Sequence, residues 1–367
     1  MVEVADVLRR YGSEYLQKFG DKMPSSHRRA FTDILRCRTP AMGGHVFECD
    51  HCGRQQYSYH SCCNRSCPKC HKSDTQAWLR AREKELLPVP YYHVIFTLPQ
   101  ELRAFARRHQ KEVYSLLIQS AADSILMLAA DPHYVGGRVG VMAVLHTWGS
   151  NLTYHPHVHC LVTGGGVASD GRTWIPARDD YLVPVRALSR VFRGHVLDRI
   201  RRQYKDLDPP ESLWQKDWVV HCKPAVQGTA TVLNYLARYI HRVAITNNRI
   251  LSAEDGKVTF RCKGPGGAQT KTMTVSAEEF IRRFLQHVLP AGVHKVRYYG
   301  LWSPSHRKTL SVLQRTLTPS AEDQQEACEE DIDAKADPPS ETRPCPYCQR
   351  GTLVWIGRLP RQGRSPP

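Results

Sequence analysis

Hydrophobic residues recur along this chain with two different spacings, which separate expected helices from expected strands. A spacing near 3.6 residues predicts helices, and alternation of apolar with polar residues predicts strands. The expected helices cover two stretches within 2–38, one through 78–86, and then 101–130, 186–203, 226–242, 277–289 and a stretch after 305. The expected strands cover 92–98, 138–148, 154–163, 218–223 and short segments within 243–263. Hairpin spacing between 138–148 and 154–163 favours an α+β core built on an antiparallel sheet over a parallel doubly wound sheet.

The length and a change in composition predict several parts. A chain of 367 residues exceeds the usual size of one domain. After Thr318 acidic residues lie among Pro, Ser and Ala, as in a disordered linker. We expect a helical and zinc-binding DNA-recognition module at 1–90, a catalytic domain at 91–317, an acidic disordered linker at 318–344, and a cysteine-pair segment with a basic tail at 345–367.

Charge and hydropathy narrow the class of partner and the compartment. Lys and Arg outnumber Asp and Glu by 51 to 35, and a net charge of +16 favours association with polyanions such as DNA. The first residues lack the apolar core of a signal peptide, and no apolar stretch is long enough to span a membrane. We therefore expect a cytoplasmic protein, in which the 13 cysteines are better candidates for metal ligands than for disulfides.

Two cysteine pairs with the spacing C-x2-C lie close together in the first quarter of the chain. Such knuckles suit tetrahedral coordination of Zn²⁺ by thiolates, as in zinc ribbons. A closed site of four thiolates has no open position for a substrate, so we expect a structural zinc that folds a small DNA-contacting module. The predicted ligands are Cys49, Cys52, Cys67 and Cys70. Within the same module, Arg65 and Lys69 are expected to contact DNA.

Other potential donors surround the predicted zinc site. These surplus donors are His60, Cys62, Cys63 and His71. They could hold a second ion, and Cys62 is a further candidate ligand of the predicted site. For Cys62 and Cys63, however, packing is the more common role. A third pair, Cys345 and Cys348, is half of a similar site without evident partners, since only Cys328 lies nearby in sequence. The single cysteines are expected to be core thiols: Cys37, Cys160, Cys222 and Cys262.

Four histidines lie within one predicted hairpin. Because alternate residues of a strand share a face, His155, His157 and His159 are expected to point the same way. We predict a divalent ion on His157 and His159, with His146 as the third ligand because the hairpin would bring it back beside them; His155 is its rival. An ion with an open position could polarise a phosphodiester oxygen. Imidazole ligands favour Mn, Co, Ni or Zn over Mg, and the sequence leaves the metal open.

The expected helix at 226–242 carries Tyr235 and Tyr239, four residues apart. They fall between its apolar stripe and the side that bears Arg238 and Arg242, so their hydroxyls could meet a phosphate. Taken alone, tyrosines at this spacing are more often residues at the edge of a core. A nearby metal and arginines would favour the phenolate, whose attack on phosphorus would give a phosphotyrosine and a DNA hydroxyl. One tyrosine could then hold a cleaved end while the other cuts a second strand.

Together these motifs resemble the HUH endonuclease superfamily, and specifically the two-tyrosine transposases of rolling-circle insertion sequences, the family of insertion sequence ninety-one. The resemblance covers most of the chain, through the motifs at 61–70, 93–99, 155–159 and 235–239. It implies a ferredoxin-like antiparallel sheet with the histidines on a central strand. It also implies that His157 and His159 are paired metal ligands and that the two tyrosines are nucleophiles. Relaxases of the superfamily place a third histidine at a spacing similar to that of His146.

The resemblance further implies an activity and its requirements. Such enzymes cut and rejoin single-stranded DNA near the ends of the element, leaving a 5′-phosphotyrosine and a 3′-hydroxyl. They need a divalent ion, Mg²⁺ or Mn²⁺, and no nucleotide cofactor. Since the chain has no Walker-type phosphate loop, unwinding is expected to come from host replication or helicase proteins. The expected partners are single-stranded DNA of the element ends and target DNA, and the expected location is the nucleoid of a bacterial cytoplasm.

Two other functions use the same motifs. A plasmid replication initiator or mobilisation relaxase would share the histidine and tyrosine chemistry, although the zinc module argues against it. A non-catalytic zinc-ribbon DNA-binding protein would use the histidines for a structural ion and the tyrosines for packing. This last alternative predicts DNA binding that is independent of metal and forms no covalent adduct.

Overall fold

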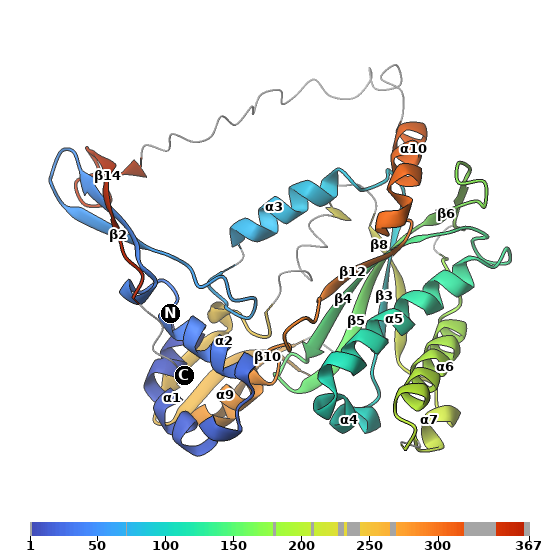
Figure 1. Cartoon of the computed structure of the whole chain (residues 1–367), viewed down its shortest axis with the longest axis horizontal. Coiled ribbons are helices and arrows are strands. Elements are labelled where there is room, and N and C mark those ends of the chain that lie inside the picture. Colours follow the sequence, from blue (N-terminus) through green and yellow to red (C-terminus); the bar gives the residue numbers. More distant parts are fainter. Residues whose placement is uncertain are drawn as a thin grey trace.

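The computed structural model describes residues 2–70, 72–178, 181–206, 209–226, 231–232, 243–264, 269–318 and 343–362. Its centre is a five-stranded sheet in the order β12-β4-β5-β3-β8, in which every neighbouring pair is antiparallel (Figure 1). These strands are β3 (Tyr91–Thr97), β4 (Gly140–Trp148), β5 (Tyr154–Thr163), β8 (Val220–Val226) and β12 (Val296–Gly300). The predicted combination of helices with an antiparallel sheet is confirmed.

Helices cover one face of this sheet. α5 (Gln110–Ala129) and α6 (Val185–Gln203) pack against each other and against the strands, and the short α7 (Ser212–Gln215) follows α6 (Figure 1). Apolar residues at alternate strand positions, such as Phe96 and Val158, are fully buried in the same core as the helices. The Phe96 ring lies 4.7 Å from that of Phe192 in α6, measured between centroids. Burial of this apolar face is the main stabilising contribution to the five-stranded sheet and its helices.

The long helix expected at 101–130 is interrupted. It consists of a 3₁₀ turn (Gln100–Leu102), α4 (Arg103–Arg108) and α5, and the break falls at His109, whose φ of −122° and ψ of 49° are not helical. The His109 ring packs 4.8 Å from the rings of both Phe105 and Tyr204. This aromatic contact with the residue after α6 accounts for a bend that helical periodicity does not reveal.

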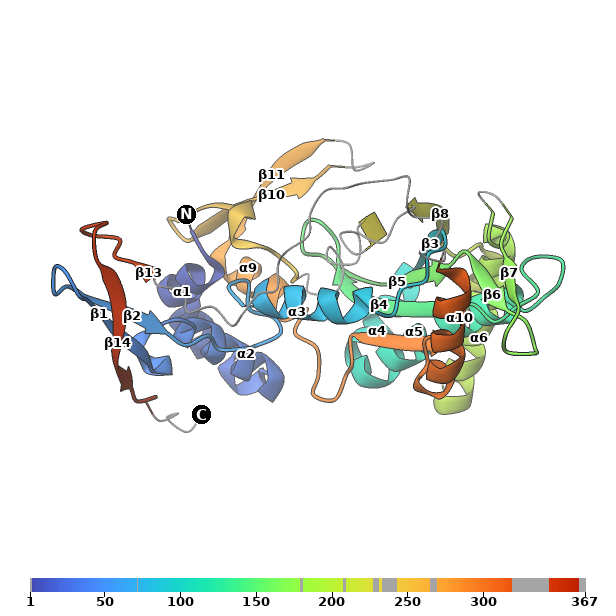
Figure 2. The same ribbon diagram turned by 90° about the horizontal axis from the view of Figure 1, so that it is seen from above.

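The opposite face of the sheet carries a second, smaller core. α3 (Lys72–Glu83) and α10 (Arg307–Leu317) lie over it, and their apolar residues meet Met142 and Val144 of β4 (Figure 2). Val232 is fully buried in the same cluster. Of the predicted helix at 226–242, Val226 is instead the last residue of β8, and Thr231 and Val232 are helical. The residues at 227–230 and 233–242 lie outside the described part of the chain.

The N-terminal helices share a core with a distant part of the sequence. α1 (Val4–Phe19) and α2 (Ser25–Arg36) pack with α9 (Ala277–Leu285) and with the three-stranded sheet β11-β10-β9. Its strands are β9 (Ile250–Glu254), β10 (Lys257–Lys263) and β11 (Thr270–Ser276). The boundary at residue 90 remains a prediction, but residues 1–90 do not pack as a unit by themselves.

The two ends of the chain meet in another sheet, which the sequence analysis missed. Its order is β13-β14-β1-β2, and β14 (Thr352–Leu359) pairs antiparallel with β1 (Gly44–Cys49) along its whole length (Figures 1 and 2). The outer strands are β2 (Gln55–Tyr59) and β13 (Arg343–Pro344). The segment expected to be a cysteine pair with a basic tail is thus a strand of the N-terminal module.

Short elements complete the described chain. They are the hairpin β6 (Gly165–Val167) and β7 (Trp174–Pro176) and 3₁₀ turns at Gly20–Lys22, Pro40–Met42, Asn247–Arg249 and Pro304–His306. Within the residues described, no helix combines the length and apolar character needed to cross a membrane.

The end of β12 supplies a test of the fold. Gly300 has a φ of +59°, and a Cβ there would lie 2.0 Å from the Val139 carbonyl oxygen. We expect Gly300→Ala to lower the free energy of unfolding by about 2–3 kcal/mol. In the control Gly194→Ala, within α6, a Cβ meets nothing within 4 Å, and we expect stability to rise by about 0.5–1 kcal/mol. Urea denaturation measures both, and equal stabilities would contradict the register of β12.

Candidate metal centre

Three histidines meet on the face of the central sheet that is opposite α5 and α6. The β4–β5 pairing sets His146 directly across from His157, and Val144 across from His159. Directly paired and alternate residues share a face, so all three imidazoles project to the same side. One ring nitrogen from each lies within 4.8 Å of the others. The structure thus groups His146, His157 and His159, with His146 only 2% exposed.

Hydrogen bonds orient two of these rings. His157 Nδ1 donates to the carbonyl oxygen of His155 at 2.7 Å, which makes Nε2 the atom available to a metal. His159 Nδ1 lies 2.9 Å from Nε2 of His93, and the two rings are stacked. For His159 to bind an ion through Nε2, its Nδ1 must carry the proton and donate to His93. Burial, and then the charge of His157, lowers the pKa of His93 to about 4, so His93 is a neutral acceptor.

His93 was not assigned a role from the sequence. It lies on β3, opposite Leu161 of β5, and so shares the face of the histidine cluster. Alternation along the strand places His93, Ile95 and Thr97 on one face. Only the pairing of β3 with β5 shows that the imidazole of His93 meets that of His159.

His155 is held differently. Its Nδ1 lies 2.7 Å from a guanidinium nitrogen of Arg103, at the start of α4. Burial, followed by the charge of Arg103, lowers the pKa of His155. The Arg103 N–H therefore donates to a neutral imidazole whose Nδ1 lone pair is occupied. Alternation alone put His155 beside His157, but this contact separates it from the cluster.

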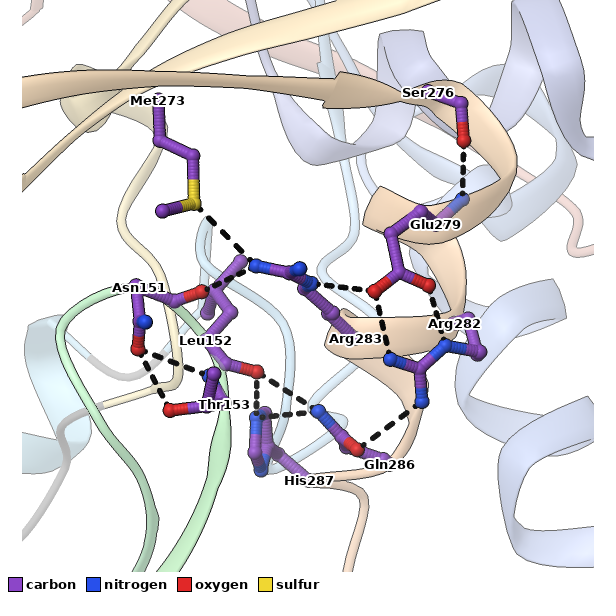
Figure 3. Close-up of polar contacts among 10 residues, drawn as sticks. All are labelled: Asn151, Leu152, Thr153, Met273, Ser276, Glu279, Arg282, Arg283, Gln286 and His287. Atoms are coloured by element: carbon purple, nitrogen blue, oxygen red, sulfur yellow. Dashed lines mark hydrogen bonds and ion pairs between the residues drawn. The ribbon is translucent and has the colours of Figure 1, made fainter.

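The tip of the β4–β5 hairpin is fixed by α9, as Figure 3 shows. The carbonyl oxygen of Leu152 accepts hydrogen bonds from Gln286 at 2.8 Å and from His287 at 3.1 Å. Arg283 donates to the Asn151 carbonyl oxygen at 3.1 Å. Leu152 is fully buried with a φ of +62°, a conformation that is costly for leucine and that these contacts maintain.

This support extends to the metal ligands. Nδ1 of His287 accepts from the Thr147 hydroxyl at 3.2 Å, next to His146 in sequence. The His146 ring stacks on Trp148, with centroids 4.5 Å apart, and the ammonium of Lys295 lies 5.1 Å from the Trp148 ring centroid. The position of His146 therefore depends on the packing of the hairpin tip against α9.

A cavity of about 330 Å³ opens beside Trp148. Aromatic and basic side chains line this cavity, as does Val243, the first described residue after the tyrosine segment. The lining includes Arg65, Trp78, Trp148, Val243, His294 and Lys295. Val232 is buried on the histidine face, and Val243 lies at this cavity. The predicted tyrosine segment lies between these two residues in sequence. Its predicted site residues lie outside the described residues: Tyr235, Arg238, Tyr239 and Arg242.

The cysteines form two clusters, and neither is the predicted set. The first joins Cys37 with Cys62, Cys67 and Cys70, and the second joins Cys49 and Cys52 with Cys345 and Cys348. The prediction of one site on Cys49, Cys52, Cys67 and Cys70 is corrected. Cys49 and Cys52 lie at the turn between the paired strands β1 and β2, and their sulfurs group with Cys345 and Cys348 rather than with Cys67 and Cys70. Proximity in sequence favoured joining the two knuckles, whereas the strand pairing separates them.

The first cluster has the dimensions of a zinc site. Its Sγ atoms are 3.6 Å apart for Cys37 and Cys70, 3.6 Å for Cys62 and Cys70, and 3.7 Å for Cys67 and Cys37. Zn–S bonds of about 2.3 Å in a tetrahedron place sulfurs about 3.8 Å apart. Hydrogen bonds among the four thiols lower the pKa of Cys70 and raise the pKa values of Cys62 and Cys67. Cys37 is thus a candidate ligand rather than a core thiol.

Two predicted DNA contacts have other partners. The guanidinium of Arg65 donates to the carbonyl oxygens of Leu289, Pro290 and Val293 at 2.6 to 2.8 Å, and its burial lowers its pKa. Lys69 forms an ion pair with Glu3. Arg65 therefore fastens the cysteine-rich segment to the rest of the molecule through these hydrogen bonds, and contact of Arg65 and Lys69 with DNA stays a prediction.

Comparisons with known proteins show the family of this chain. Residues 7–98 match the family model described as "Transposase zinc-binding domain", and residues 140–309 match that described as "Putative transposase". The "Putative transposase y4qJ" of Sinorhizobium fredii (strain NBRC 101917 / NGR234) is 41% identical over 377 residues, covering 96% of this chain and 94% of the relative. The "Transposase for insertion sequence element IS801" of Pseudomonas savastanoi pv. phaseolicola is 27% identical over 301 residues, covering 73% and 68%. No solved structure matches.

These matches define the class of protein as a transposase with an N-terminal zinc-binding domain, an enzyme that acts on DNA. The chain belongs to the two-tyrosine transposase family of insertion sequence ninety-one, which confirms the resemblance drawn from its motifs.

Buried histidines predict a loss of stability in acid. Burial is the first cause that lowers the pKa of His287 to about 3 and that of His27 to about 4, against 6.5 when unfolded. Between these values the unfolded chain binds more protons, so the stabilisation is complete above pH 6.5 and declines as the pH falls toward 4. At pH 5 each of these histidines should lower the free energy of unfolding by about 2 kcal/mol relative to its value above pH 6.5. Urea unfolding at pH 7 and pH 5 measures this, and His27→Gln and His287→Gln should each reduce the difference. An unchanged difference in both would show that other groups cause it.

Proposed function

We propose that this transposase cleaves and rejoins single-stranded DNA at the ends of its insertion sequence through a 5′-phosphotyrosine intermediate, as in rolling-circle transposition. The observation that carries the proposal is the set of three histidines on one face of the sheet, whose ring nitrogens lie within 4.8 Å of one another. We take the five-stranded antiparallel sheet with α5 and α6 to be the ferredoxin-like HUH core, since its central strand β5 carries two of the three histidines.

The histidine cluster suits a divalent metal ion. Its three ring nitrogens converge, and the Nδ1 contacts of His157 and His159 leave each Nε2 as the ligand atom. We assign His146 as the third ligand in place of His155, whose Nδ1 is engaged by Arg103. When bound, a divalent ion, Mg²⁺ or Mn²⁺, would polarise the scissile phosphate and stabilise negative charge as it develops. In this scheme Trp148 and His93 are positioning residues.

Tyr235 and Tyr239 are the proposed nucleophiles. The phenolic oxygen of one tyrosine bonds to phosphorus while the bond from phosphorus to the 3′-oxygen breaks. The phenolic proton is lost, the departing 3′-oxygen gains a proton, and the DNA 5′-phosphate stays on the tyrosine. Reversal by another 3′-hydroxyl rejoins the strands without an external energy source. The second tyrosine could hold a further cleaved end, and Arg238 and Arg242 would neutralise nearby phosphates.

Aromatic and basic side chains suggest where DNA bases and phosphates bind. Trp148 and Lys295 line the cavity beside the histidines. On the sheet β13-β14-β1-β2, Tyr57 and Trp355 are about half exposed, and Tyr57 stacks with Tyr59. Exposed rings beside cations suit stacking with unpaired bases. The net charge of +16 supports the same partner, and host helicase or replication proteins would supply the single strand.

Trapping the covalent intermediate tests the nucleophiles. Labelled single-stranded DNA from the element ends, incubated with the protein and Mg²⁺ or Mn²⁺, should give an adduct that resists denaturation. We expect the Tyr235→Phe/Tyr239→Phe double variant to form none, because phenylalanine lacks the attacking oxygen. Loss in one single variant would identify the initiating tyrosine. Absence of an adduct with the wild-type protein on every end sequence would favour the non-catalytic zinc-ribbon protein instead.

Separating cleavage from binding tests the histidines. His157→Ala or His159→Ala should lower the cleavage rate at least about 100-fold, since transition-state charge would lose its stabilisation, while DNA affinity changes little. His155→Ala is the matched control from the same strand, and we expect a much smaller loss of rate. Rates come from single-turnover cleavage and affinities from fluorescence anisotropy. If His155→Ala were as damaging as His157→Ala, the assignment of the third ligand would be wrong.

A further inference from the structure

The cluster that joins the two ends of the chain has the geometry of a metal site. The Sγ atoms of Cys49 and Cys348 are 3.6 Å apart, and those of Cys52 and Cys345 are 3.8 Å apart. A disulfide would need about 2.05 Å. The edge of a tetrahedron with Zn–S bonds of about 2.3 Å is about 3.8 Å, which agrees with both distances. Four sulfurs with no imidazole or carboxylate among them select zinc over hard cations.

The backbone of both knuckles is shaped for thiolate ligands. The N–H of Cys52 points at Sγ of Cys49, and the N–H of Gly351 points at Sγ of Cys348, each at 3.4 Å. In both cases the donor follows the accepting cysteine by three residues. Such N–H donors stabilise negative charge on sulfur. The backbone turn that follows the first cysteine is the same in both knuckles, since the N–H of Gly53 donates to the Cys49 carbonyl oxygen and the N–H of Gln349 donates to the Cys345 carbonyl oxygen, each at 3.0 Å.

Contacts outside the cysteines hold the knuckles against each other. The N–H of Asp50 donates to the Thr352 carbonyl oxygen at 3.1 Å, and the N–H of Thr352 donates to the Asp50 carboxylate at 2.7 Å. Gly351 is packed so closely that a Cβ there would lie 2.6 Å from Sγ of Cys49 and 2.5 Å from Cβ of His51. From this point β14 runs along β1, so that β1 is paired on both edges.

We propose that Cys49, Cys52, Cys345 and Cys348 form a second structural zinc site, which clasps the C-terminal segment onto the N-terminal module. The match to the zinc-binding family model ends at residue 98 and does not include the knuckle of Cys345 and Cys348. The site closes the chain across the acidic stretch at 319–342, so the position of β14 does not depend on the length of that stretch. The clasp also places the exposed ring of Trp355 on the same sheet as Tyr57.

Metal content gives the first test. Zinc per chain is measured by elemental analysis in a His157→Ala/His159→Ala background, so that the histidine site does not contribute. We expect two zinc ions in this background and one after Cys345→Ser/Cys348→Ser. The control Cys63→Ser/Cys222→Ser removes two thiols outside both clusters and should leave two. Unchanged zinc in the Cys345→Ser/Cys348→Ser protein, or iron in place of zinc, would overturn the proposal.

A second variant keeps every thiol. Gly351→Val should weaken the site because its side chain would displace Sγ of Cys49, so that competition with a chromophoric chelator removes one zinc at least about tenfold more readily. Gly357→Val is the control, since a Cβ at this β14 residue meets nothing within 4 Å. Equal zinc retention by the two variants would show that the two knuckles do not share an ion.

The clasp itself can be tested in the full chain. A recognition site for a sequence-specific protease is inserted within 319–342, and the cut protein is passed through a gel-filtration column. We expect the fragment that begins near Arg343 to elute with the rest of the protein, and to separate from it after Cys345→Ser/Cys348→Ser. Separation without any cysteine change, or retention in spite of it, would overturn the proposed role of zinc. None of these measurements depends on DNA cleavage, so they stand apart from the test of the nucleophiles.

Discussion

Antiparallel pairing of β4 with β5 is the constraint on which the proposed centre depends. It sets His146 across from His157 and leaves His159 two residues further along the same face. On the other face of β5, Val158 and Cys160 are fully buried against the helices. A shift of the register by one residue would turn the imidazoles into that apolar core and expose the valine and the cysteine. The packing of α5 and α6 therefore fixes the site, although neither helix contributes a ligand.

The hairpin tip connects this centre to the zinc-binding part of the chain. Leu152 is buried in the same cluster as α1, α2 and α9, and Cys67 belongs to that cluster too. Arg65 adds three hydrogen bonds to the carbonyls that follow α9. The first cysteine cluster, α9 and the tip of the hairpin thus share one core. This core therefore supports both the first cysteine cluster and the hairpin tip on which the position of His146 depends.

Much of the fold and part of the site could be predicted from local patterns. Alternation located β3, β4 and β5 to within a few residues, because one face of each strand is buried. The same alternation and the hairpin turn brought His146 to His157. Helical periodicity could not foresee the break at His109, which depends on Tyr204 from after α6. Nor did it predict β12, a strand at the edge of the sheet.

The sequence by itself determined the chemistry: C-x2-C pairs with the spacing of zinc ligands, a hairpin rich in histidine, two tyrosines four residues apart, and the family to which they belong. Only the tertiary structure decided which of these groups meet. Cys37 joins Cys70 because the end of α2 packs beside the second knuckle, and Cys49 joins Cys348 because β14 pairs with β1. Periodicity is set by neighbouring residues and can be read locally. A ligand set drawn from both ends of a chain depends on the packing of everything between them.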